Sequence, residues 1–270
     1  MRLMIRCLLV LAALSPAACG ADEQTAAPVS QATGAFPVTV KHKFGTTEIP
    51  SAPKRVVTVG YTDQDITLAL GVVPVGVGDF LGGYDWRKRP WAQAALDGAQ
   101  PEVVAGQEIN FEAVAAQRPD LIIAVNAGLK KADYDKLSKI APTVAQSGDY
   151  IDYGMPWDEQ TLLVGKALGR EERAQKVVDE VRAKFAAFRK AHPEFEGKTA
   201  VLAYGGPDGY GAYATGDNRS RFLADIGFKT PTEIDKLAGD SFYTEFSQEQ
   251  FRLMDQDVVV MYGAKKDILA

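Results

Sequence analysis

One long helix, predicted over residues 171–191, constrains the fold of this chain more than any other feature. Acidic residues begin the helix and basic residues end it, as the helix dipole favours, and Pro193 follows it. At 1.5 Å per residue the helix would span roughly 30 Å, the width of a small domain. Its apolar residues recur at helical spacing and therefore share one face: Ala174, Val177, Val178, Val181, Phe185 and Phe188.

The segments on both sides of this helix alternate strands with helices. Such alternation is typical of parallel α/β sheets. An antiparallel coiled-coil partner is one interpretation of the long helix. A rigid connection between two α/β lobes fits better, because the α/β pattern resumes after it. Strands are predicted at 54–60, 72–78, 120–125, 142–145, 198–204 and 257–262, and shorter helices at 63–70, 111–117 (with Asn110 as N-cap), 133–140, 157–168, 219–226 and 248–254.

The N-terminus has the pattern of an export signal. Arg2 and Arg6 precede a short apolar run, and small residues then lead to Cys19. This order resembles the lipobox of bacterial lipoproteins, with Pro16 where an aliphatic residue is usual. We therefore expect a signal peptide over 1–18, lipid attached to Cys19 and a flexible tether over 19–36. The alternative is an ordinary signal peptide with an incidental cysteine.

Composition narrows the possible functions. The formal charge of −5 would become −7 once Arg2 and Arg6 leave with the signal, and an acidic chain is a poor ligand for nucleic acid. His42 and His192 are the only histidines in the sequence, too few for a histidine-based metal site. The sequence has no Gly-x-Ser-x-Gly elbow and no Walker-type phosphate loop, so it does not read as an enzyme.

Six segments stand out by their order and spacing along the chain: 53–57 (PKRVV), 69–76 (ALGVVPVG), 110–123 (NFEAVAAQRPDLII), 140–144 (IAPTV), 223–228 (LADIGF) and 247–250 (SQEQ). Together they resemble the substrate-binding lipoproteins of ferric-siderophore and cobalamin ABC importers, and the likeness extends from residue 53 to residue 262. It implies an α/β fold of two Rossmann-like lobes, joined by one long rigid α-helix, with a ligand cleft between the lobes.

The resemblance divides the chain into an N-terminal lobe over 37–156, interlobe helices over 157–192 and a C-terminal lobe over 193–270. The last helix of the C-terminal lobe only begins near residue 265, so we expect the natural chain to continue past Ala270. The location implied is extracytoplasmic, either periplasmic or held at the cell membrane by the lipid.

The predicted ligand is a ferric siderophore, of hydroxamate or citrate type. Aromatic rings suit the organic shell of such a chelate, and guanidinium groups suit its oxygens. Haem, cobalamin and bare ferric ion are alternatives, and an enzyme or a structural surface lipoprotein is an alternative of another class. No cofactor besides the N-terminal lipid is expected. The predicted ligand contacts are Tyr61, Tyr84, Trp86, Arg87, Asn126, Tyr153, Tyr204, Arg219, Arg221 and Tyr243.

The resemblance also implies a partner, an ABC permease of two subunits with a cytoplasmic ATPase, served by a monomeric binding protein. Glu112 and Glu249 match the glutamates that dock on arginines of the permease subunits, although each could simply complement a helix dipole. The chain departs from ferrichrome-binding relatives at Gly106 and Gln107, where they carry an arginine, and near Gly128, where they carry a tyrosine. A chelate other than ferrichrome is therefore expected.

Overall fold

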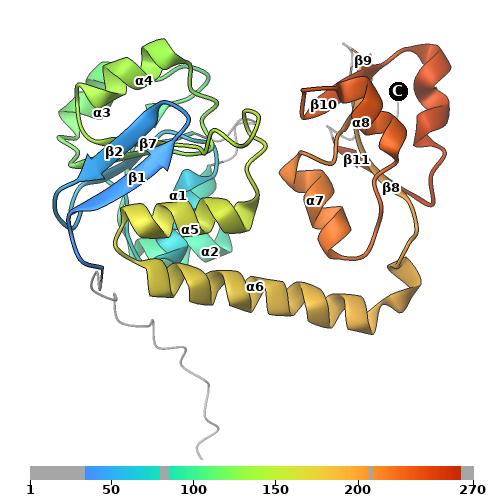
Figure 1. Ribbon diagram of the computed structural model, residues 1–270, viewed down its shortest axis with the longest axis horizontal. Coiled ribbons are helices and arrows are strands. Elements are labelled where there is room, and N and C mark those ends of the chain that lie inside the picture. The colour runs from blue at the N-terminus through green and yellow to red at the C-terminus, as the bar shows by residue number, and fades with distance from the viewer. Residues whose placement is uncertain (1–33, 80–84, 207–208, 263–270) are drawn as a thin grey trace, which may run out of the picture.

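The structure is a computed structural model that describes residues 34–79, 85–206 and 209–262. Two α/β lobes are joined by the helix α6 (Glu171–Ala191), which runs beneath both of them (Figure 1). The predicted two-lobe architecture and the bounds of the long helix are thus confirmed. Cys19, Tyr84 and most of the predicted tether lie outside the described residues.

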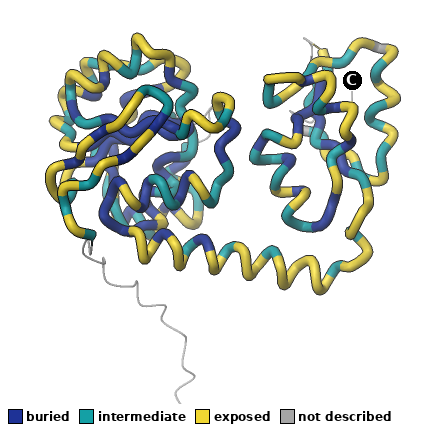
Figure 2. Tube along the Cα trace, viewed as in Figure 1, coloured by how far each residue is buried: buried dark blue, intermediate teal, exposed yellow. Residues whose placement is uncertain are grey.

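The N-terminal lobe is built on a parallel sheet of five strands in the order β5-β4-β3-β6-β7. Its central strands are fully buried, as expected for a parallel sheet covered on both faces (Figure 2). The strands are β3 (Val56–Thr58), β4 (Gly76–Gly78), β5 (Glu102–Ala105), β6 (Leu121–Ala124) and β7 (Thr143–Ala145).

Helices and a separate hairpin enclose this sheet. The hairpin is formed by β1 (Val38–His42) and β2 (Gly45–Ile49), which pair antiparallel. Asn110 caps α3 as predicted, because its Oδ1 accepts a hydrogen bond from the Ala113 N–H at 3.0 Å. The helices are α1 (Asp63–Ala69), η1 (Trp86–Lys88), α2 (Pro90–Leu96), α3 (Phe111–Ala116), α4 (Lys131–Ser138) and α5 (Trp157–Ala167).

The C-terminal lobe has a mixed sheet in the order β10-β9-β8-β11. The pair β8 and β11 is parallel, whereas β9 pairs antiparallel with both β8 and β10. Its elements are η2 (Pro193–Phe195), β8 (Ala200–Gly206), β9 (Gly209–Tyr213), α7 (Asn218–Asp225), α8 (Thr232–Ala238), β10 (Tyr243–Phe246), η3 (Gln248–Met254) and β11 (Val258–Tyr262).

The apolar stripe of α6 serves both lobes. Near its start, Ala174 belongs to the core of the N-terminal lobe, Val177 packs against that core, and Val178 is buried as well. Near its end, Phe188 lies 6.0 Å from Phe195, measured between ring centroids, and Phe195 stacks on Phe228 at 4.8 Å. The helix therefore packs on a different lobe at each end, through buried residues at its start and through the partly exposed Phe188 near its end, and its middle is largely exposed (Figure 2).

Three parts of the fold differ from the prediction. Several strands and α-helices were not predicted, most of them short elements without an apolar run long enough to stand out: β1, β2, β5, α2, β9, β10 and α8. The region 248–254 is a 3-10 helix, in which a capping box joins Ser247 and Gln250. The end of the predicted tether belongs to the fold, because Gly34 N–H donates to the Gly169 carbonyl at 3.1 Å and Phe36 packs on the core.

Gly165 tests how α6 is attached. A Cβ at this position of α5 would overlap the Cβ of Ala174 on α6, so Gly165→Ala must push the two helices apart. We expect a loss of about 1–3 kcal/mol in the free energy of unfolding, measured by urea denaturation. Lys166→Ala, at an exposed position of the same helix, is the control. Equal stability of the two variants would contradict this packing.

Candidate functional site

Two tyrosine rings stack where the N-terminal lobe faces the C-terminal lobe. Tyr61 follows β3, and Tyr153 lies in the connection that leads from β7 to α5. Their ring centroids are 5.6 Å apart and their planes differ by 5°. Gly128 leaves space for the Tyr153 ring, since a Cβ there would lie 2.5 Å from the Tyr153 Cζ. The Tyr153 ring therefore lies between the Tyr61 ring and the backbone of Gly128.

Aromatic side chains of the C-terminal lobe continue from this pair. Phe242 meets Tyr153 edge-on, with centroids 5.7 Å apart and planes at 69°. From Phe242 the contacts run to Tyr243 at 5.0 Å and on to Tyr204 at 6.2 Å. Tyr204 in turn lies 5.3 Å from Tyr213. The contacts cross from one lobe to the other without a break. We call this set the aromatic series: Tyr61, Tyr153, Phe242, Tyr243, Tyr204 and Tyr213.

A cation stands at the C-lobe end of the aromatic series. The Cζ of Arg219 lies 3.5 Å from the centroid of the Tyr213 ring, a cation–π contact. The same guanidinium is held by Asp217, with Nε to Oδ1 and Nη2 to Oδ2 both at 2.8 Å. Arg219 is therefore oriented by a two-point pair while its face covers an aromatic ring.

Two phenols of the series, those of Tyr153 and Tyr204, stay protonated at physiological pH. Burial is the main cause that raises the pKa of Tyr153 to about 12, and the nearby Tyr61 contributes to the same shift. Burial is also the main cause that raises the pKa of Tyr204 to about 12, and the negative charge of Glu245 contributes to it. Both phenols are therefore neutral, and each donates its one O–H to a backbone carbonyl at 3.4 Å, Tyr153 to Ala127 and Tyr204 to Thr244.

A buried carboxylate underlies the N-lobe end of the series. Asp63 has no exposed surface, and its two oxygens accept hydrogen bonds from the N–H groups of Val125 and Asn126, each at 3.0 Å. A Cβ on Gly60 would overlap Asp63, so only glycine fits there. Asp63 therefore ties the loop that carries Tyr61 to the loop after β6.

Burial of Asp63 has an electrostatic cost. Desolvation raises the pKa of Asp63 to about 6, even though backbone N–H groups of Asn126, Val125 and Gly60 lower it. From the sequence, Asp63 was predicted as the first residue of the helix at 63–70, and its structural role was missed. A short polar residue at the start of a helix looks like an ordinary N-terminal acid in the sequence.

The structure brings together five of the predicted ligand contacts: Tyr61, Tyr153, Tyr204, Tyr243 and Arg219. Asn126 lies beside them, nearly buried, and its Nδ2 donates to Thr62 Oγ1 at 2.8 Å. Arg221 instead donates from Nη1 to the backbone carbonyl of Gly154 at 2.6 Å. The sequence did not single out Phe242, because the strand that follows it, β10, was not predicted.

Trp86 and Arg87 differ from the expectation. The Trp86 side chain is 1% exposed and packs in a separate core cluster with Leu68, Val77 and Leu96, so in this structure it offers no surface to a ligand. An aromatic residue in the segment after a strand suggested a ligand contact, but Leu68 of α1 and Leu96 of α2 pack against it. Arg87 is half-buried and pairs with Asp85, with Nε to Oδ1 at 2.9 Å.

The two glutamates predicted to dock on a permease are both exposed, one on each lobe. Glu112 lies in the first turn of α3 and Glu249 in the first turn of η3. These positions agree with either interpretation, a docking point or a charge that complements a helix start.

Two features are absent from the described residues, a metal-ligating cluster and a membrane-spanning helix. Within the described ranges, no group of three or more His, Cys, Asp or Glu side chains could hold a metal ion. Over those same residues, no helix has both the length and the apolar character required to cross a membrane.

Comparison with known proteins places this fold in a class. The sequence matches the periplasmic binding protein family over residues 56–269, and the chain belongs to that family. It is 31% identical over 237 residues to a putative ABC transporter substrate-binding lipoprotein, YhfQ of Bacillus subtilis, covering 86% of this chain and 72% of the relative.

Solved structures of similar proteins include two with a siderophore bound. PiaA of Streptococcus pneumoniae in complex with ferrichrome is 29% identical, with a TM-score of 0.73 over 85% of this chain and 80% of that one. SirA of Staphylococcus aureus complexed with staphyloferrin B is 32% identical, with a TM-score of 0.70 over 84% of this chain and 78% of that one.

Asp63 makes stability depend on pH in a predictable direction. Its folded pKa of about 6 exceeds the model-peptide value of 3.8, so the folded state binds this proton more tightly than the unfolded state. Relative to Asp63→Asn, the free energy of unfolding of the natural chain should therefore rise by about 2–3 kcal/mol as the pH falls from 7 to 4.

Urea denaturation at several pH values measures this difference. Asp240→Asn, at an exposed position of the C-terminal lobe, controls for general effects of removing a carboxylate. A difference between the natural chain and Asp63→Asn that stays constant with pH, or that falls on acidification, would contradict the buried carboxylate.

Proposed function

We propose that this chain is the solute-capturing component of an ABC importer, and that it binds a ferric siderophore between its two lobes. The observation that carries the proposal is the aromatic series, because it presents ring faces from both lobes to one site. Membership of the periplasmic binding protein family and siderophore complexes of PiaA and SirA support the same ligand class.

The chemistry of the site favours a complete chelate over a bare ferric ion. The phenols of Tyr153 and Tyr204 donate to backbone carbonyls at 3.4 Å, and they would redirect these long hydrogen bonds to the oxygens of an organic ligand while their rings cover its carbon skeleton. A bare ferric ion would need several anionic ligands, and the described residues hold no group of three or more His, Cys, Asp or Glu side chains that could bind it. Haem and cobalamin are the remaining alternative ligands, and direct binding measurements distinguish them from a ferric chelate.

The proposal also gives roles to the N-terminus and to the partner. Lipid on Cys19 would hold the protein outside the cytoplasm beside its permease and so raise its local concentration there. ATP hydrolysis would belong to a separate cytoplasmic subunit. The chain would act as a monomer, with one lobe on each permease subunit, and as a binding protein rather than an enzyme.

Isothermal titration calorimetry tests the ligand class directly. We expect saturable binding of a ferric trihydroxamate, such as ferrioxamine B, or of ferric citrate, and no saturable binding of haem, cobalamin or free ferric ion. Tyr153→Phe removes one hydroxyl and should weaken chelate binding about fivefold, the effect of about 1 kcal/mol for one hydrogen bond. Tyr153→Ala, which also removes the ring, should weaken it further.

Tyr134→Phe is the matched control, because Tyr134 stacks on Phe44 elsewhere in the N-terminal lobe. Saturable binding of haem or cobalamin alone, or chelate binding that Tyr153→Ala leaves unchanged, would refute the proposed ligand and site.

Charge reversal tests the proposed docking points. Glu112→Arg combined with Glu249→Arg should abolish iron uptake in cells and leave the chelate affinity of the purified protein unchanged, because charge pairs at a rim guide docking. Glu172→Arg with Glu233→Arg is the matched control, since these glutamates also lie in the first turns of helices. Equal uptake by the two double variants would contradict the docking role and would favour the helix-dipole interpretation of Glu112 and Glu249.

A further inference from the structure

Helix α7 of the C-terminal lobe is hydrogen-bonded to a short stretch of the N-terminal lobe, residues 153–157. Arg221 donates from Nη1 to the carbonyl of Gly154 at 2.6 Å. Asn218, one turn earlier, donates from Nδ2 to the carbonyl of Met155 at 3.2 Å. Residues three apart share one face of a helix, so a single face of α7 holds the backbone of this stretch.

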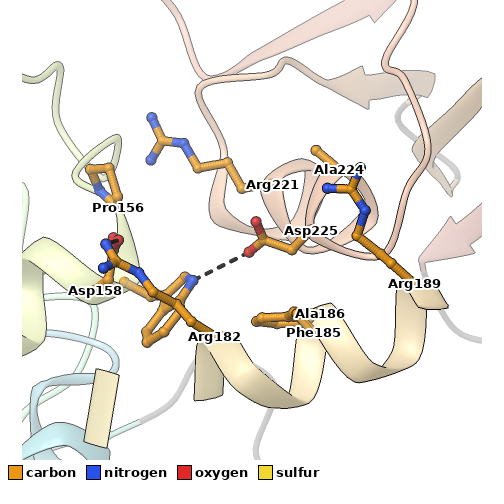
Figure 3. Close-up of a pocket in the computed structure, with 10 residues that line it drawn as sticks. Pro156, Asp158, Arg182, Phe185, Ala186, Arg189, Arg221, Ala224 and Asp225 are labelled. Atoms are coloured by element: carbon orange, nitrogen blue, oxygen red, sulfur yellow. Dashed lines mark hydrogen bonds and ion pairs between the residues drawn. The ribbon is translucent and has the colours of Figure 1, made fainter. Parts of the chain in front are cut away.

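A third hydrogen bond joins the same two segments, with its donor in the N-terminal lobe and its acceptor on α7. Trp157 donates from Nε1 to the Asp225 carboxylate at 3.3 Å, the dashed line in Figure 3. Asp225 lies four residues after Arg221 and therefore on the same side of α7. Helix α7 thus donates two of the three hydrogen bonds, from Asn218 and Arg221, and accepts the third at Asp225. We call these three hydrogen bonds the latch.

The latch begins one residue after a ring of the aromatic series. Tyr153 has a φ of +64°, a left-handed backbone conformation. Residues other than glycine keep this conformation only where surrounding contacts impose it. Its ring stacks on Tyr61 and meets Phe242, so it touches both lobes. The carbonyl that Arg221 holds belongs to the residue next to Tyr153, and the latch therefore bears directly on the orientation of this ring.

A cavity of about 560 Å³ lies between the latch and the long helix α6 (Figure 3). Two arginines on its α6 wall already have carboxylate partners, Arg182 with Asp158 at 2.6 Å and Arg189 with Glu196 at 2.8 Å. Arg221 differs from both, because it reaches across the lobes to a backbone carbonyl.

We infer that Arg221 is a positioning residue: it holds Tyr153 in the aromatic series by anchoring the carbonyl of Gly154 to the C-terminal lobe. Separation of the lobes would break the latch and release Tyr153 from its binding position. The anchoring itself follows from the geometry, whereas its consequence for the release of a chelate rests on the proposed function. Arg221 thereby acts through the backbone of its neighbour, in place of the ligand contact that the sequence suggested.

Hydrogen exchange followed by mass spectrometry tests the anchoring without any ligand. Arg221→Ala should raise the exchange of the Gly154 amide, which donates to the Ile151 carbonyl at 2.9 Å and lies in the peptide covering residues 150–157, about tenfold or more, since a lost hydrogen bond to a charged group has effects of that size. Arg221→Lys, which can still donate to the carbonyl, should restore much of the protection. Arg182→Ala removes an arginine from the same cavity and should leave this peptide unchanged. Exchange that Arg221→Ala does not alter would overturn the inference.

The affinity for ferrioxamine B and ferric citrate, measured by calorimetry, then separates positioning from direct contact. Positioning requires Arg221→Ala to weaken binding about tenfold and Arg221→Lys to recover most of it, in parallel with exchange. Weaker binding with unchanged exchange would make Arg221 a direct ligand contact and overturn the inference. If the natural chain binds neither chelate, the proposed function fails, and the exchange comparison still decides whether Arg221 anchors the segment.

Discussion

The packing of α6 into both lobes is the constraint on which the rest of this molecule depends. Ala174 and Val178 are buried in one lobe, and Phe188 joins aromatic side chains of the other. A single helix with no loop inside it cannot swing as a pair of extended strands can, so the separation of the lobes is set by its length. The aromatic series can cross between the lobes only because that separation is small enough for Tyr153 to reach Phe242.

The site combines a rigid support with neutral chemistry. Asp63 is buried at the cost of a raised pKa, and in return it joins the loops that carry Tyr61 and Asn126. Above it, the phenols of Tyr153 and Tyr204 remain protonated, and Arg219 is paired with Asp217. Such a surface offers ring faces and hydrogen-bond donors, which suits an organic shell around a metal better than the metal itself.

Much of this arrangement could be predicted from the sequence, because the relevant signals are local. The helical periodicity over 171–191 gave the long helix, and Asn110 was identified as a cap. Tertiary context decided the rest. Trp86 is buried by helices that pack over it, Arg221 bonds to a carbonyl 67 residues away, and β10 has no apolar run to reveal it. Sequence spacing carries no record of such contacts.

The distance between the lobes, with and without chelate, tests the central claim most directly. Spin labels at Ser138 and Lys236, both exposed and on opposite lobes, would report it by pulsed electron resonance in a chain with Cys7 and Cys19 replaced by serine. If α6 and the latch set the separation, the distribution should be narrow before binding, and its mean should shift by about 2 Å or less on saturation with the chelate. A broad distribution without chelate, or a shift several times larger on binding, would contradict the account.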